Sequence, residues 1–173
     1  GTARQAVFIA GDTTPGYEAT YHNIQGMNWP YVLNAPFEVV SGSVVHLPAG
    51  TVVKLYDSYI NVYGTLDLEG TTSNRVVFTS YHDDTYGGDT DGSATPPAVG
   101  DWNGIYLRSN NSLQYALIRY AGYGIHLPSN VSVTFSDNVV ENVSYAMYFS
   151  SGSPVLNNNT VTNAAYAIVV GGV

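Results

Sequence analysis

The chain has 173 residues, of which 45% are hydrophobic and 10% are charged, and its formal net charge is -8. This composition predicts one ordered domain and excludes a disordered chain. Only five Lys and Arg residues are present and they are scattered, which excludes the basic patch that nucleic-acid binding requires. The absence of cysteine excludes disulfides and thiolate metal sites, and no apolar run approaches the roughly 20 residues of a membrane-spanning helix.

The first 38 residues show no repeat. They contain bulky residues at 29–33 and turn-forming residues at 12–16, but their apolar positions follow no constant spacing. We expect residues 1–38 to form an N-terminal cap, because the first strand of a stacked β-structure exposes an edge that has to be covered. Residues 39–173 are then the repetitive part of the domain.

Short predicted strands begin at residue 39 and follow one another without helices between them. Each is rich in β-branched residues and is bounded by Gly, Pro, Ser or Asn, a pattern that predicts strands joined by tight turns. The clearest of them before the first interruption are 44–47, 49–55, 60–63, 64–68 and 76–79. The fold class is therefore expected to be all-β.

Residues 80–101 interrupt this pattern with a run that is rich in Asp and Gly and nearly free of core residues. We interpret it as a long insertion loop. Five of the thirteen acidic residues of the chain lie in it, namely Asp83, Asp84, Asp89, Asp91 and Asp101. A hard cation with oxygen ligands would relieve their mutual repulsion, so we expect these residues to bind calcium.

The alternative for this loop is that its Asp and Gly residues simply occupy solvated turns. A transition metal is less favoured, because His82 is the only imidazole nearby. The chain returns to the strand pattern at Trp102, whose indole we expect to fill the base of the insertion.

Three copies of one segment follow, beginning at residues 117, 139 and 160. In each copy an aromatic residue is followed by a small residue and then by two apolar residues at alternating positions. A period of about 20 residues built from alternating strands is typical of a parallel β-solenoid, in which successive coils lie about 4.8 Å apart. Two inward columns are expected: Ile125, Met147 and Ile168, and Leu127, Phe149 and Val170.

Polar residues repeat with the same period. Asn138 and Asn159 should stack at a turn, where their side chains can satisfy backbone amides in successive coils. Arg119 and Glu141 lie one coil apart, which predicts an exposed ion pair worth less than about 1 kcal/mol.

Three stretches, 48–55, 76–80 with the Asp-rich loop, and 100–105, are similar to the right-handed parallel β-helix repeat domains of secreted bacterial and archaeal surface proteins. The resemblance covers roughly residues 39–170. It implies a single-stranded right-handed parallel β-helix, here of about five coils, at an extracellular or cell-surface location. One Asp that normally separates the equivalents of Asp91 and Gly92 is missing from this chain.

A second candidate site is the outward column formed by Tyr106, His126 and Tyr148. Sugar rings stack on aromatic side chains while neighbouring polar groups bind their hydroxyls, so this column is a candidate for polysaccharide binding. The alternative is that these residues are ordinary surface aromatics, because the chain contains fifteen Tyr residues.

These patterns predict a non-catalytic extracellular or cell-surface module that is stabilised by calcium and binds a carbohydrate or another surface partner. No convincing catalytic set is present in the sequence. Two alternatives stay open: part of a carbohydrate-active enzyme, either a polysaccharide lyase or a glycoside hydrolase, and a purely structural spacer. An enzyme would need a cleft with clustered carboxylates.

The last expected coil, residues 154–170, contains no charged residue, so nothing in it discourages another strand from pairing with its edge. We expect an open edge at this end. Such an edge would be covered either by further coils of a longer chain or by end-to-end self-association.

Overall fold

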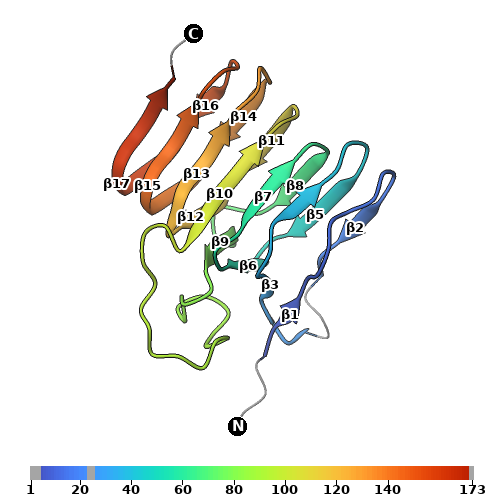
Figure 1. Cartoon of the computed structure of the whole chain (residues 1–173), viewed down its shortest axis with the longest axis vertical. Coiled ribbons are helices and arrows are strands. Elements are labelled where there is room, and N and C mark those ends of the chain that lie inside the picture. The colour runs from blue at the N-terminus through green and yellow to red at the C-terminus, as the bar shows by residue number, and fades with distance from the viewer. Residues whose placement is uncertain (1–4, 23–25, 172–173) are drawn as a thin grey trace.

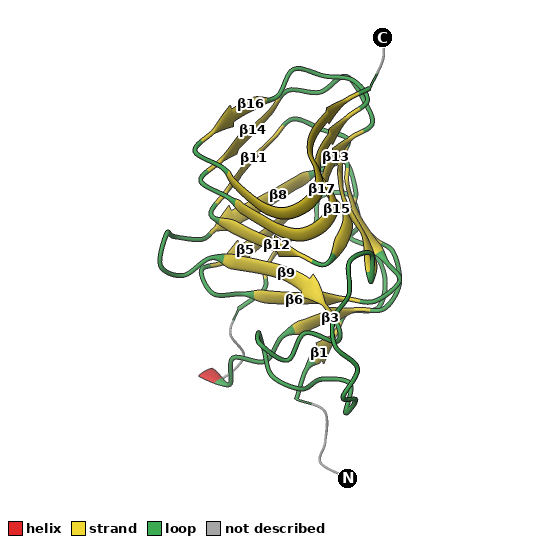
Figure 2. Ribbon diagram, turned by 90° about the vertical axis from the view of Figure 1, so that its left-hand side faces the viewer, coloured by secondary structure: helices red, strands yellow, loops and turns green. Residues whose placement is uncertain are grey.

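The computed structural model describes residues 5–22 and 26–171 and shows an all-β chain. Its parallel strands stack as a β-solenoid of about seven turns (Figure 1). Helix is almost absent, and β-strands line the sides of the stack (Figure 2). The described residues contain no helix that is long and apolar enough to cross a membrane.

Most turns contribute a strand to each of three faces. The first face contains β1 (Val7–Phe8), β3 (Tyr31–Leu33), β6 (Val52–Leu55), β9 (Val76–Ser80) and β12 (Ala116–Arg119). The second face contains β4 (Phe37–Val39), β7 (Tyr59–Val62), β10 (Trp102–Leu107) and β13 (Ala121–Leu127). Two long strands, β15 (Val139–Phe149) and β17 (Thr160–Val170), run through both of these faces.

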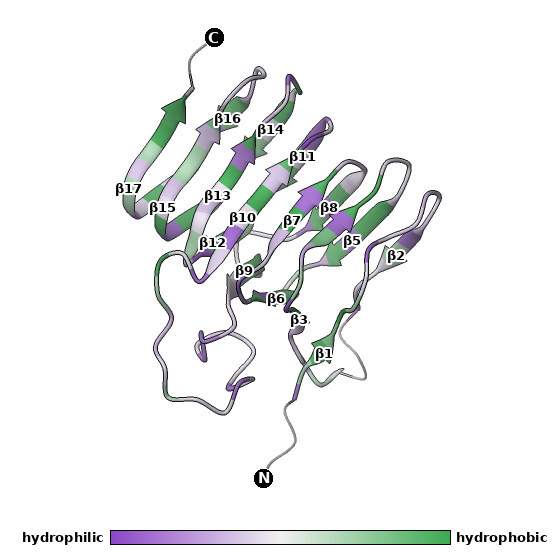
Figure 3. Ribbon diagram, viewed as in Figure 1, coloured by the Kyte–Doolittle hydropathy of each residue, from purple (hydrophilic) through white to green (hydrophobic). Residues whose placement is uncertain are grey.

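The third face consists of two three-stranded sheets. One contains β2 (Glu18–Thr20), β5 (Val44–Pro48) and β8 (Thr65–Glu69), and the other contains β11 (Asn111–Gln114), β14 (Val133–Ser136) and β16 (Val155–Asn157). Apolar residues recur along the strands of the stack (Figure 3), and their buried side chains form one core.

The predicted register of the inward columns is confirmed. Ile125 pairs with Met147, and Met147 pairs with Ile168 in the next turn. Burial follows the stack, because Met147 is 2% exposed whereas Ile168, in the last strand, is 52% exposed. No other described strand pairs with the outer edge of β17, so its inward side chains are left uncovered.

The number of turns differs from the expectation of about five coils. Strands β1 and β3 pair in parallel with β3 and β6, and β2 pairs with β5. The segment 1–38, which the sequence analysis interprets as a cap, therefore carries strands that continue the stack through its described residues. These strands contain only two or three residues, too few for an alternating pattern to be recognised.

The asparagine column is also confirmed. Asn138 is 1% exposed, and its side chain accepts a hydrogen bond from the Ala116 amide at 2.7 Å and donates one to the Leu113 carbonyl at 3.0 Å. Asn159, one turn later, accepts a bond from Asn138 and donates to the Phe135 carbonyl at 2.7 Å. The column thus satisfies backbone groups at the corner between the third face and the first.

The long loop leaves the stack between β9 and β10, at the corner between the first face and the second (Figure 1). It does not project freely into solvent. The backbone carbonyl of Gly88 accepts a hydrogen bond from Lys54 in β6, and a Cβ added to Gly87 would lie 2.8 Å from a side-chain carbon of Pro30. Loop residues 81–101 are therefore packed against earlier turns.

Candidate functional site

The structure brings together three of the five aspartates that the sequence predicts as calcium ligands. Carboxylate oxygens of Asp84, Asp89 and Asp91 all lie within 4.8 Å of one another. Asp84 and Asp89 are exposed, and Asp91 is half-buried. Three carboxylates at this spacing offer oxygen ligands from one side, which is part of the six to eight ligands that calcium takes.

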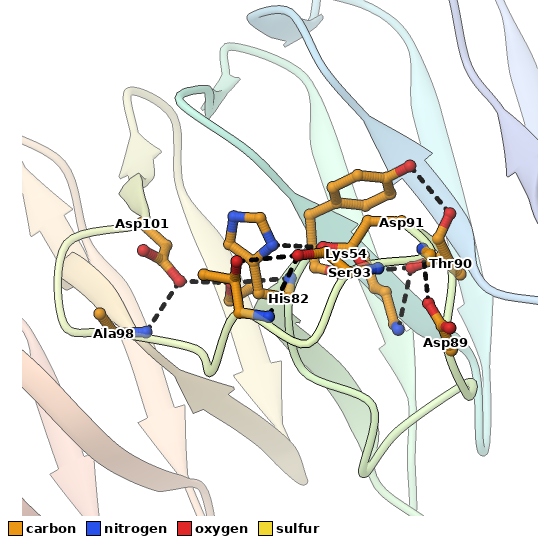
Figure 4. Close-up of polar contacts among 12 residues, drawn as sticks. Lys54, His82, Asp89, Thr90, Asp91, Ser93, Ala98 and Asp101 are labelled. Carbon is orange, nitrogen blue, oxygen red and sulfur yellow. Dashed lines mark hydrogen bonds and ion pairs between the residues drawn. The ribbon is translucent and has the colours of Figure 1, made fainter.

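The protein itself orients two of these carboxylates (Figure 4). The carboxylate of Asp91 accepts a hydrogen bond from the amide of Ser93 at 2.8 Å, and it also contacts Nδ1 of His82. Burial alone would raise the pKa of Asp91, but the bonds from His82 and Ser93 outweigh it and lower the pKa. Asp89 accepts a bond from the Gly92 amide at 2.7 Å. Asp91 is therefore ionised at neutral pH.

Lys54, in β6, is a partner of the loop that was not identified from the sequence. Its side chain is fully buried, and Nζ donates to the Gly88 carbonyl and to Oγ1 of Thr90 at 3.1 Å (Figure 4). Burial lowers the pKa of Lys54, and the aspartates of the loop act in the opposite direction. An ammonium group of the protein thus already offsets part of the negative charge that was expected to require calcium.

Asp83 is used differently from the three clustered aspartates. It is 1% exposed, accepts a hydrogen bond from Oγ1 of Thr79 at 2.6 Å and lies 2.9 Å from Nη1 of Arg119. Nε of Arg119 lies 2.7 Å from the carboxylate of Glu141, as a close ion contact rather than a directed hydrogen bond. The guanidinium also lies 5.2 Å from the ring of Tyr86.

The expected pairing of Arg119 with Glu141 is confirmed by their register, but the description of an exposed pair is wrong. The Arg119 side chain is only 13% exposed, because the loop brings Asp83 and Tyr86 over it. Sequence spacing cannot show a loop that covers a surface position.

Asp101 is at the base of the loop (Figure 4). Its Oδ2 accepts hydrogen bonds from Oγ of Ser80 at 2.5 Å and from the amide of Ala98 at 2.8 Å. These contacts join the two ends of the loop, so Asp101 has a structural role that is separate from the Asp84, Asp89 and Asp91 group.

The second candidate site is on the second face. The predicted outward column is present, because Tyr106 pairs with His126 and His126 pairs with Tyr148 in the next turn. Their rings are close, with centroids 5.1 Å apart for the first pair and 5.0 Å for the second. Asn61 precedes them in the same column, and Val169 follows them.

A second column of tyrosines runs beside the first, and the sequence analysis did not assign it to the site. Tyr123, Tyr145 and Tyr166 pair in register and stack with centroids 5.0 and 4.9 Å apart. We call the combined set the aromatic face, which consists of Tyr59, Tyr106, Tyr123, His126, Tyr145, Tyr148 and Tyr166. Their ring contacts form one continuous chain.

The two columns share one face because the strands are irregular. Strict alternation would place residues three apart, such as Tyr123 and His126, on opposite faces. Pairing between β10 and β13 shifts register between Gly104 and Ile105, and this shift accommodates the extra residue. The repeated aromatic that precedes a small residue, Tyr123 and its equivalents, was the sequence signal for the second column.

The side chains of the aromatic face are uncharged along most of its length. Burial, and then the nearby charge of Arg108, lower the pKa of His126, so its imidazole is uncharged at neutral pH. At one end, Tyr59, Asn61, Asn103, Tyr106 and Arg108 line a shallow pocket of about 200 Å³. The face thus combines stacked rings with one polar pocket.

Another cluster on the third face was also missed. His46 lies 2.9 Å from Asp67, 3.4 Å from Glu18 and 3.6 Å from Glu69. Burial alone would lower the pKa of His46, but hydrogen bonds to Asp67 and Glu18 outweigh it and raise the pKa.

Comparison of the chain with family models, with curated proteins and with solved structures found no match. The geometry and chemistry of the two sites are therefore the basis for a functional proposal.

Proposed function

We propose that this domain is a non-catalytic binding module of the extracellular space or a cell surface, which binds a polysaccharide on the aromatic face. The observation that carries this proposal is the unbroken series of ring contacts from Tyr59 to Tyr166. Five successive turns at about 4.8 Å each give a row about 19 Å long, which is the shape of a site for an extended chain.

Polysaccharides have apolar ring faces and polar edges. Aromatic side chains bind the apolar ring faces by dispersion and apolar burial, while phenol, amide and imidazole groups bind the hydroxyls at the polar edges. The aromatic face supplies both kinds of group. The residues that line its pocket include no carboxylate, which favours binding over glycoside hydrolysis, since hydrolysis uses a pair of carboxylates.

Removing single rings tests this proposal. We expect Tyr148→Ala and Tyr106→Ala each to weaken binding of a polysaccharide identified on a glycan array by about tenfold, because central aromatic residues dominate such interfaces. Affinity electrophoresis measures the change. The matched control is Tyr17→Ala, which removes an exposed tyrosine outside the aromatic face and should leave affinity unchanged.

The absence of binding to any polysaccharide, or an equal loss in the Tyr17→Ala control, would contradict carbohydrate recognition by this face. The purely structural alternative would then be favoured.

We also propose that calcium binds at Asp84, Asp89 and Asp91 and stabilises the loop. With an extracellular type of affinity, about 0.2 mM, and about 2 mM calcium, the stabilisation is RT ln 11, or about 1.4 kcal/mol. Calorimetric titration of chelator-treated protein should detect one site, and thermal unfolding should shift upward by a few degrees.

Two aspartate variants separate specific calcium binding from a general salt effect. Asp84→Asn and Asp89→Asn remove exposed carboxylates of the cluster and should abolish the calcium-dependent shift. Asp57→Asn, at an exposed corner outside the loop, makes the same chemical change and should retain the shift. A flat titration with an unchanged melt would mean that Lys54 and Arg119 suffice to balance the loop.

A further inference from the structure

The pocket at the end of the aromatic face is lined by a cationic side chain, that of Arg108, whose terminal nitrogens contact no oxygen of the described residues. Lys54, Arg75 and Arg119 each direct a terminal nitrogen to an oxygen of the protein. Within residues 5–22 and 26–171, Arg108 forms no ion pair, and neither Nη1 nor Nη2 has a hydrogen-bond acceptor. Both nitrogens are therefore available to a ligand.

Arg108 is nevertheless held in place. Its Nε donates to Oδ1 of Asn61 at 3.1 Å, and its guanidinium lies 5.6 Å from the ring centre of Tyr63. Asn61 is 6% exposed, and its Nδ2 donates to the carboxylate of Glu38 at 3.1 Å. Only this amide orientation satisfies both neighbours, since Nε can only donate and the carboxylate can only accept. Asn61 thus connects Glu38 to Arg108 by two hydrogen bonds, without a direct ion pair between the carboxylate and the guanidinium.

The tyrosine column lacks a ring at Gly104, next to Asn103 in the pocket lining. Gly104 pairs with both Tyr59 and Tyr123, so it occupies the column position between them. Its φ is +144°, and a Cβ there would clash with the carbonyl oxygen of Tyr123, so no larger residue fits. The pocket is lined by the rings of Tyr59 and Tyr106, whose centroids are 5.7 Å apart, and by the exposed residue Asn103.

We propose that this pocket is a subsite for a carboxylate-bearing sugar unit, so that the domain selects acidic polysaccharides; the inference rests on the proposed polysaccharide function. The planar guanidinium presents two parallel N–H groups that match the two oxygens of a carboxylate. Tyr59 and Tyr106 contact the sugar ring, and Asn103 bonds a hydroxyl. A volume of about 200 Å³ is below that of sites for larger ligands and suits one unit of the chain.

The test compares one oligosaccharide of uronic acid units with the same oligosaccharide after its carboxyl groups are reduced to primary alcohols. Because a charge-assisted hydrogen bond contributes more than a neutral one, we expect at least about tenfold tighter binding of the acidic form to the wild-type domain. Arg108→Gln should remove this preference by weakening binding of the acidic form much more than binding of the reduced form. Arg108→Lys should keep part of it, since it keeps the charge but loses the fork.

Asn103→Asp is a second variant, at an exposed position, that places a negative charge in the pocket without removing Arg108. It should also lower the preference. Equal wild-type affinity for the two forms, or an equal loss of both in Arg108→Gln, would overturn the subsite and leave the polysaccharide function standing. Absence of binding to both forms would overturn the two proposals together. Tighter binding of a sulfated than of a carboxylated oligosaccharide would overturn the carboxylate assignment.

Discussion

Replacing Arg119 by Met should lower the free energy of unfolding by about 3–5 kcal/mol, the loss typical of breaking a buried ion pair from one side. Asp83 would remain 1% exposed with its strongest counter-charge removed. Met keeps most of the length of the side chain, but it removes the charge together with the cation–π contacts to Tyr86 and Tyr120. Urea unfolding followed by circular dichroism measures the difference.

Glu141→Gln is the matched control for this result. Glu141 is the more exposed partner of Arg119, with 27% of its side chain accessible, and removing its charge leaves Arg119 paired with Asp83. The expected loss is below about 1 kcal/mol. If Arg119→Met also cost less than about 1 kcal/mol, the loop would not depend on the Arg119–Asp83 pair, and Thr79 and the Thr85 amide would be sufficient partners for Asp83.

The stacked part of the fold could be predicted from the sequence because equivalent positions in a solenoid have the same environment. Met147 must be apolar for the same reason as Ile125 and Ile168, so the period of the sequence is also the register of the strands. The stacking of Asn138 and Asn159 follows the same rule. A strand as short as β1 contains too few residues for a repeat to be recognised, and two turns were therefore missing from the expected number.

The environment of the loop could not be predicted, because it has no counterpart in neighbouring turns. Lys54 occupies an outward strand position between Val32 and Thr79, where the sequence predicts an exposed side chain. Gly88 and Thr90, more than thirty residues later, fold over it and bury it completely. The folding of the loop over the strands also explains why Asp83 pairs with Arg119 and does not lie with the other aspartates. Arg119 belongs to a strand that follows the loop in the chain, so their sequence positions do not predict the contact.

The aromatic face was half predicted for a related reason. Alternation along a regular strand identifies Tyr106, His126 and Tyr148 as outward, and the structure agrees. Tyr123 and Tyr145 are three residues before His126 and Tyr148, so alternation alone assigns them to the opposite side. The pairing of β10 with β13 shifts register at Gly104, and β13 and β15 then pair in register through both columns, so the two columns lie together.

Replacing Trp102 by Ala should also lower the free energy of unfolding by about 3–5 kcal/mol, the usual cost of removing a large buried aromatic side chain. Trp102 is 0% exposed, as expected for a residue that fills the base of the insertion. Its Nε1 donates to the carbonyl of Arg119 at 2.8 Å, so the variant loses a hydrogen bond in addition to packing. Asp101, which closes the loop through Ser80 and Ala98, is its neighbour in the chain.

Trp102→Phe separates these two contributions, because it keeps an aromatic ring in the core but removes the indole N–H. Leaving the Arg119 carbonyl without this donor should cost about 1–3 kcal/mol, clearly less than the Ala variant. Denaturant unfolding monitored by circular dichroism measures both variants, and proteolysis within residues 81–101 reports whether the loop loosens before the stack unfolds. A loss below about 1 kcal/mol for Trp102→Ala would show that the core closes over the missing indole, and the loop would then be anchored by Asp101 and Arg119 rather than by Trp102.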